Sequence, residues 1–290
     1  MALLASYTPS GGASPASFTI VAQPWFPKGD YLVPAAAIPR GVSIGEVQEP
    51  GRSTRNTEVA GKAAYAGDGW DASVSYFHGF DHRPVFAETS HAIVSPTAYT
   101  VNAQRIFQRV NAAGADASYS GGPWVYRFET AYLWTEGGKS MLLIPSHWDL
   151  VVGAERPFLD NFRVQAQLVS RYFPDWSDPA AAPGPDAVSI AINRQIAAAN
   201  ALLQQYQHRW GTASTLRISY ALEQPAISAE LLWYEGLNDG DYYLRPMLSY
   251  GVLESLRWYL GYDHYGGPAD KSIGSLQTYN AVFTEVKLSF

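Results

Sequence analysis

The sequence contains no cysteine, which excludes both a disulfide framework and a thiolate metal site. It also lacks an excess of basic residues: the formal net charge is -6, which argues against nucleic acid as a partner. No stretch reaches the roughly 18 consecutive apolar residues of a transmembrane helix, and the mean hydropathy is -0.13. No basic segment or long apolar run follows Met1, so no signal peptide is recognisable.

What the chain has instead is a repeated alternation of apolar and polar residues, the period of a β-strand with two different faces. The clearest case is Trp124–Trp134, where aromatic residues alternate with Val125, Arg127 and Glu129. About thirteen segments of strand length follow this pattern. They are Leu3–Thr8, Ser17–Gln23, Thr57–Ala66, Trp70–Asp81, Arg105–Ser120, Trp124–Trp134, His147–Glu155, Phe162–Phe173, Thr215–Glu223, Ile227–Tyr234, Tyr242–Tyr250, Leu256–Tyr265 and Thr278–Phe290.

The connections alternate between short turns and longer loops, the longer ones at 26–55, 82–100, 177–207 and 266–277. Outer-membrane barrels have short periplasmic turns and long extracellular loops. We therefore predict an all-β fold: an antiparallel up-and-down transmembrane β-barrel of about 13–14 strands, with residues 1–290 as one domain. The same parity places the start of Leu3–Thr8 outside the cell. Because bacterial barrels have even strand numbers, we expect an upstream strand and a signal peptide before Met1.

The insertion at 177–207 carries a helical pattern. Asp186 can cap a helix, and the apolar residues that follow recur at helical spacing. These are Val188, Ile192, Ile196, Ala199, Leu203 and Tyr206. We expect an extracellular loop helix that packs on a neighbouring loop, with a constriction or lid in the lumen as the alternative.

Charged residues fall on the face opposite the apolar side of each strand, which in a barrel is the lumen. The candidate pore-lining residues are Arg127, Glu129, Arg163, Arg171, Arg217, Glu223, Glu230, Arg245, Arg257, Asp263, Glu285 and Lys287. They could form a network of mutual salt bridges that stiffens the wall. They could also form an arginine ladder facing acids across a channel, with a transverse field. The two interpretations are compatible.

Large aromatic residues concentrate near strand ends on the apolar face. Amphipathic rings prefer a membrane interface, so we predict an aromatic girdle. Its members are Trp70, Trp124, Trp134, Trp148, Trp233 and Phe290.

Two kinds of segment carry a resemblance to known proteins. The last strand, Thr278–Phe290, alternates and stops on an aromatic residue, and it resembles the C-terminal strand of Gram-negative outer-membrane β-barrels. Trp70–Val85 and Thr19–Pro27 are similar to segments of a family of proteobacterial outer-membrane β-barrel proteins that are porin-like in build. The resemblance implies a fold and a location, and it implies recognition of the last strand by the barrel-insertion machinery. It supplies no substrate.

Three groups of residues could suggest other chemistry. His78, Asp81 and His82 fit no zinc spacing, so a rim position is the simpler interpretation. His147 near Asp149, and His264 near Asp263, come with no nucleophile elbow or ordered triad. Asn238–Asp241 lacks the later Glu of a calcium loop and is more simply a hairpin turn. We therefore predict no catalytic residue, no metal site and no cofactor.

The sequence favours an outer-membrane porin-like channel, not an enzyme, through which small solutes diffuse passively along a charge-lined lumen. Its partners would be outer-membrane lipid and lipopolysaccharide, the insertion machinery and small solutes. One alternative is an outer-membrane barrel that binds or imports a hydrophobic or organic ligand through its loops. A second is a soluble β-sandwich binding protein, since soluble sheets also alternate.

Overall fold

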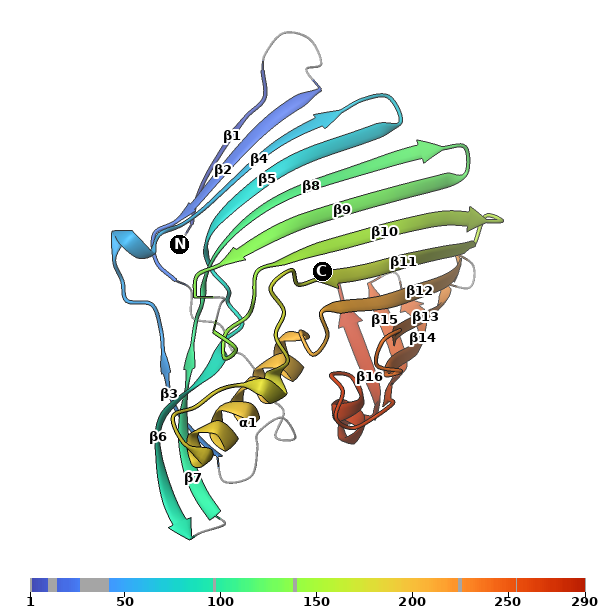
Figure 1. Ribbon diagram of the computed structural model, residues 1–290. Helices are drawn as coiled ribbons and strands as arrows, with labels where there is room; N and C mark the ends of the chain where they lie inside the picture. The colour runs from blue at the N-terminus through green and yellow to red at the C-terminus, as the bar shows by residue number, and fades with distance from the viewer. Residues whose placement is uncertain are drawn as a thin grey trace. The chain divides into compact units, whose positions relative to one another are not determined.

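A computed structural model describes residues 2–9, 15–26, 42–95, 98–137, 140–223, 226–253 and 255–289. Thirteen strands form one sheet in the order β1-β2-β4-β5-β8-β9-β10-β11-β12-β13-β14-β15-β16 (Figure 1). Their bounds are β1 Leu3–Tyr7, β2 Ala16–Gln23, β4 Glu58–Ala66, β5 Trp70–Phe80, β8 Arg109–Gly121, β9 Trp124–Thr135, β10 His147–Phe158, β11 Phe162–Tyr172, β12 Trp210–Leu222, β13 Ile227–Gly236, β14 Tyr242–Leu253, β15 Leu256–Gly266 and β16 Ala281–Leu288.

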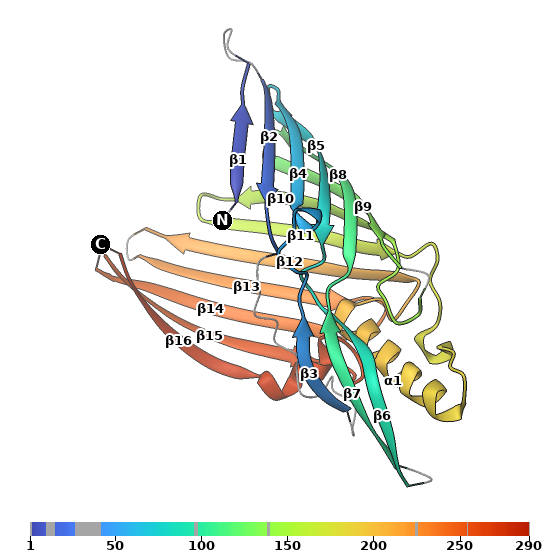
Figure 2. The same cartoon turned by 90° about the vertical axis from the view of Figure 1, so that its left-hand side faces the viewer.

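Each predicted strand has its counterpart in this sheet, and strands adjacent in the order are antiparallel wherever the register is described. The all-β, antiparallel up-and-down fold class expected from the alternation is therefore confirmed. Hairpin connections keep sequence neighbours side by side, as Figure 2 shows for β12 to β16.

The register separates two faces of the sheet, because residues directly opposite each other in neighbouring strands share a face. From β12 to β16, one face pairs apolar residues with each other: Leu216 with Trp233, Ile218 with Leu231, Leu248 with Leu260, and Trp258 with Val286. The other face pairs polar ones: Ser219 with Glu230, Ser228 with Ser249, Arg257 with Lys287, and Tyr259 with Glu285. The predicted division into an apolar and an ionic face is confirmed for these strands.

The tight turns lie where glycine allows them. Gly69 precedes β5 with a φ of 72°, and Gly240 precedes β14 with a φ of 67°. Side chains other than Gly adopt this left-handed region at a cost. The two turns therefore match the hairpins predicted at Gly67–Gly69 and Asn238–Asp241.

Two predicted loops contain strands, which corrects the interpretation of 26–55 and 82–100 as irregular. β3 (Val42–Gln48), β7 (Ala98–Ile106) and β6 (Val85–Ser95) form a second sheet in the order β3-β7-β6. β3 is parallel to β7, and β6 is antiparallel to it. Residues 27–41 lie outside the described part of the chain. The predicted strand Arg105–Ser120 is likewise divided between β7 and β8.

The helix α1 (Ala187–Gln204) explains why this second sheet forms. Asp186 caps it, its Oδ1 accepting from the Ser189 amide at 2.9 Å. Ile192 and Ile196 are buried against Phe86 and Val101 of the small sheet. The helix thus packs on a sheet built from loop segments, where a neighbouring loop was expected, and Figure 1 shows the two side by side.

A second buried cluster lies beside the first and joins Val85, Ile144, Phe173, Ala201 and Tyr206. Three short 3₁₀ helices complete the described elements: η2 Thr54–Asn56, η3 Pro179–Ala181 and η4 Gly274–Tyr279. Within the described ranges, no helix has the length and apolarity needed to cross a membrane.

The chain divides into two compact units. The first comprises residues 1–117, 130–149 and 171–210, and both buried apolar clusters lie in it. The second comprises residues 118–129, 150–170 and 211–290, including most of the predicted pore-lining residues. The ionic site described next is therefore treated unit by unit.

Candidate functional site: the ionic face of the sheet

The most buried charge on the ionic face of the second unit is Glu155 of β10, whose side chain is 12% exposed. Its Oε2 accepts from Arg127 of β9 at 2.7 Å, and its Oε1 accepts from Arg163 of β11 at 3.0 Å. One carboxylate thus joins three consecutive strands. Charge-assisted bonds of this length are among the stronger polar contacts in a protein.

Two further pairs join neighbouring strands of the same unit. Arg217 of β12 donates through Nη2 to Glu230 of β13. Arg245 of β14 approaches Asp263 of β15, with 3.5 Å between Nε and Oδ1, and Tyr243 also donates to this carboxylate. Each pair joins two adjacent strands of the wall.

The first unit carries ion pairs on the same strand system. Arg171 of β11 donates from Nε and Nη2 to the two oxygens of Asp149 in β10, at 2.6 and 2.9 Å. This is the two-pronged geometry that a guanidinium and a carboxylate favour. Asp116 of β8 is bound by the Ser73 hydroxyl, and Lys62 lies 3.5 Å away.

Four predicted lining residues occupy the ionic face in other ways. Arg257 donates to the Ser249 hydroxyl at 2.9 Å and lies opposite Lys287, so two cations are neighbours there. Glu285 lies opposite Tyr259, and Glu129 is exposed two residues after Arg127.

Five of the six arginines therefore pair with a carboxylate on an adjacent strand. This arrangement favours the interpretation as a salt-bridge network within the wall, since each pair largely cancels its own field. The ionic pairs predicted by sequence involve two acids that the pore-lining set did not include, Glu155 and Asp149. Their signal was present, because both alternate with apolar residues in β10.

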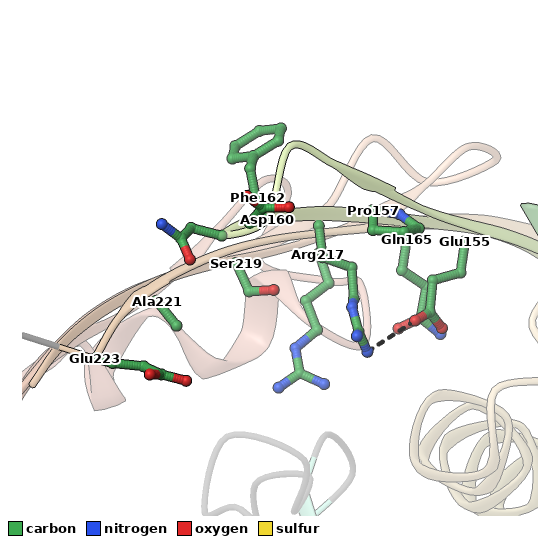
Figure 3. A pocket seen from close by; sticks show the side chains of 11 residues that line it. Glu155, Pro157, Asp160, Phe162, Gln165, Arg217, Ser219, Ala221 and Glu223 are labelled. Atoms are coloured by element: carbon green, nitrogen blue, oxygen red, sulfur yellow. Dashed lines mark ion pairs between the residues drawn. The ribbon is translucent and has the colours of Figure 1, made fainter. Parts of the chain in front are cut away.

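A hollow of about 400 Å³ opens on this face of the second unit, near the turn between β10 and β11 (Figure 3). Arg217, Ser219 and Glu223 extend into it from β12 and the residue that follows, and Phe162 points to the opposite side of the sheet. Glu155, Arg163 and Gln165 complete the polar wall. The hollow offers guanidinium donors, carboxylate acceptors and neutral hydrogen-bonding groups to a polar solute.

The opposite face of the sheet is apolar and exposed. Among the predicted girdle residues, Trp70, Trp134, Trp148 and Trp233 are each 41–49% exposed. Trp70 stacks on Tyr65, and Trp124 stacks on Tyr126. Phe290 lies outside the described residues. The role of these rings as a girdle stays a prediction.

The histidines have separate partners. His82 lies 3.0 Å from Glu58 Oε1, an oxygen that also accepts from the Phe80 amide. His78 contacts Asn111, and Asp81 binds Arg83. In the described ranges, no group of three or more His, Cys, Asp or Glu residues is arranged to hold a metal ion.

Titratable groups outside the strands are perturbed by hydrogen bonding and burial. The Ser189 amide lowers the pKa of the Asp186 carboxyl below its usual value of 3.8. Burial raises the pKa of the Tyr206 hydroxyl. Burial also raises the pKa of Asp241, whose Oδ2 accepts from the Ile273 amide at 2.7 Å. These groups fasten the helix and the loop before β16.

The chain matches no protein-family model and no curated protein sequence. Among solved structures it is similar to the KdgM porin in complex with disordered oligogalacturonate, at 10% identity and a TM-score of 0.30. A second structure of the KdgM porin gives 11% identity and the same TM-score. In both cases 81% of this chain and 93% of the other are covered.

A third similar structure is the Salmonella typhi outer membrane phospholipase (OMPLA) dimer with bound calcium, at 12% identity and a TM-score of 0.32. It covers 81% of each chain. Similarities of this size do not determine the function of this chain, which is argued below from the two faces of its sheet.

Proposed function

We propose that this protein is an outer-membrane β-barrel that acts as a porin-like channel, through which small polar solutes diffuse passively. The observation that carries the proposal is the separation of the two sheet faces. Leu248, Val282 and Val286 are 53%, 72% and 63% exposed on the apolar face. Exposed apolar area of this extent would be unfavourable in water and is suited to lipid.

The ionic face suits the inside of such a barrel. Its arginine–carboxylate pairs line a wall that hydrogen-bonds water and polar solutes, and the hollow beside Arg217 gives a solute a place to dwell. Closure of the sheet would satisfy the backbone groups of the end strands β1 and β16, as spanning a bilayer requires.

The proposed location brings its partners with it. Outer-membrane lipid and lipopolysaccharide would cover the apolar face, and the insertion machinery would recognise β16 with its alternating exposed residues Val282, Val286 and Leu288. No chemical step is proposed for the protein, so it would act without turnover.

Single-channel recording in planar bilayers tests the function. The purified full chain should give steady, open, ion-conducting steps. A silent protein that binds a hydrophobic ligand saturably would contradict the channel and favour a ligand-binding barrel. A protein that stays monodisperse without detergent and migrates identically on gels before and after boiling would contradict the membrane location.

A further inference from the structure

One cation lies on the face of the sheet that otherwise carries apolar side chains. Arg156 of β10 alternates with Glu155 and shares a face with Ala154 and Phe158. Glu155 pairs with arginines on the ionic face, so Arg156 points to the other side. This position breaks the alternation of β10, and it is the starting point of the inference, which rests on the proposed membrane location.

Aromatic rings hold the Arg156 guanidinium. Its Cζ lies 5.2 Å from the centre of the Trp124 ring and 4.6 Å from that of Phe158. Stacking on ring faces orients a guanidinium and leaves its in-plane N–H donors for another ligand. The Trp124 ring is itself stacked on Tyr126, with 6.0 Å between centroids.

Arg156 has no described counter-ion. Its Nε is buried without a hydrogen-bond partner, and no ion pair is recorded for it within the described residues. The same-face residues of β9 from Trp124 to Phe128, and of β11 from Phe162 to Leu168, include no acid. Asp160, in the adjoining turn, lines the hollow on the ionic side. The face therefore presents an uncompensated positive charge.

An apolar groove begins next to this charge. It has a volume of about 610 Å³, and its floor includes Ala154 and Ala166, with Tyr126, Leu168 and Trp233 around them. Ala154 is two residues before Arg156, so the groove starts about 7 Å from it on the same face. Small residues beside large ones leave the recess, and an acyl chain matches it in chemistry.

We propose that Arg156 and this groove form a binding site for a membrane phospholipid. The guanidinium, stacked on Trp124 and Phe158, receives the phosphate, and one acyl chain lies in the groove over Ala154 and Ala166. Arginine binds phosphate through two parallel N–H donors, which a point charge does not match. The occupant is thus a lipid that carries both a phosphate and acyl chains.

Native mass spectrometry of the detergent-solubilised full chain tests the site. The probes are dioctanoylphosphatidylglycerol, dioctanoylglycerol, which has the same chains without phosphate, and inorganic phosphate, which has no chain. The wild-type chain should bind the phospholipid about ten-fold more tightly than dioctanoylglycerol. Arg156→Gln should remove this difference, and Arg194→Gln, an exposed arginine on α1, should keep it.

Ala166→Trp separates the two halves of the site. It should fill the groove and weaken both lipids, while leaving the ratio between them unchanged. Equal retention of phospholipid and dioctanoylglycerol by the wild type would overturn the proposal. So would unchanged phospholipid affinity in Arg156→Gln, or displacement of the lipid by inorganic phosphate at low millimolar concentration.

The channel proposal is judged separately, from wild-type conductance in the same preparation. If the wild type conducts and shows no preference for the phospholipid, the lipid site is wrong and the channel stands. If the wild type fails to enter bilayers at all, both proposals fall.

Discussion

At the scale of single residues, the fold depends on a few polar side chains that serve several partners at once. Glu155 binds two guanidinium groups, and Asn200 binds three backbone groups. In each case one substitution leaves more than one partner unsatisfied. The cost therefore exceeds that of an ordinary surface contact, which is worth about 1 kcal/mol or less.

Glu155→Gln tests the carboxylate that joins β9, β10 and β11. Removing its charge should lower the free energy of unfolding by about 1–3 kcal/mol, because two charge-assisted bonds weaken. It should also shift the reversal potential of the channel toward anions. Glu285→Gln is the matched control: it removes a carboxylate from the same face and should shift selectivity with little loss of stability. Equal unfolding free energies for the two variants would contradict the account.

Asn200→Ala tests the joint between α1 and the small sheet. The Asn200 side chain is 0% exposed, accepts from the Phe86 amide at 2.8 Å, and donates to the carbonyls of Phe86 and Leu142 at 2.9 Å each. Losing these bonds should lower the free energy of unfolding by about 3 kcal/mol. Asn193→Ala, on the exposed side of α1, should cost less than about 1 kcal/mol. Chemical denaturation in detergent, followed by Trp fluorescence, makes the comparison.

At the scale of elements, regularity decides what the sequence could predict. The long alternating strands were predictable because their period is read directly from side chains, as in β9 and β16. The strands β3, β6 and β7 were not, because their short apolar runs are interrupted by Pro, Gly and polar residues. They become a sheet only where Phe86 and Val101 pack on Ile192 and Ile196 of α1.

The candidate site was predictable to the same degree. Alternation placed the arginines on the ionic face, but it could not pair them. The partner of Arg127 depends on the register between β9 and β10, and the connection between those strands is not a tight turn. Arg156 carried a signal that the alternation analysis passed over: it is a charge at a position where β10 should be apolar.

The register of β14 and β15 can be tested by crosslinking, since the chain contains no cysteine of its own. Leu248 lies opposite Leu260, so the pair Leu248→Cys and Leu260→Cys should crosslink in high yield under mild oxidation. The control pair Leu248→Cys and Tyr259→Cys places the thiols on opposite faces and should stay reduced. Equal yields, measured by gel shift after proteolysis, would contradict the register.

The N-terminus of α1 should respond to acid. The pKa of Asp186 is lowered by the Ser189 amide, so folding favours its charged form. Its stabilising effect is present above the usual pKa of 3.8 and is lost as pH falls through the lowered value. Hydrogen exchange in the first turn, corrected for intrinsic rates, should accelerate over that range. In Asp186→Asn, which cannot titrate, the acceleration should be absent.

At the scale of the whole molecule, the account depends on which medium meets each face. The apolar face carries exposed Leu, Val and Trp side chains, and the ionic face carries paired charges. A membrane and an enclosed aqueous lumen satisfy both at once, whereas water on both sides leaves the apolar face unfavourably exposed.

The most direct test is a single-cysteine scan along β16 in liposomes. Positions Val282 and Val286 belong to the apolar face, and Glu285 and Lys287 belong to the ionic face. A membrane-impermeant maleimide should label cysteine at 285 and 287 and leave 282 and 286 unmodified, whereas a fluorophore attached in detergent at 282 or 286 should be quenched by brominated lipid. Uniform labelling along the strand, or labelling confined to 282 and 286, would contradict a lipid-facing apolar side and a water-filled ionic side.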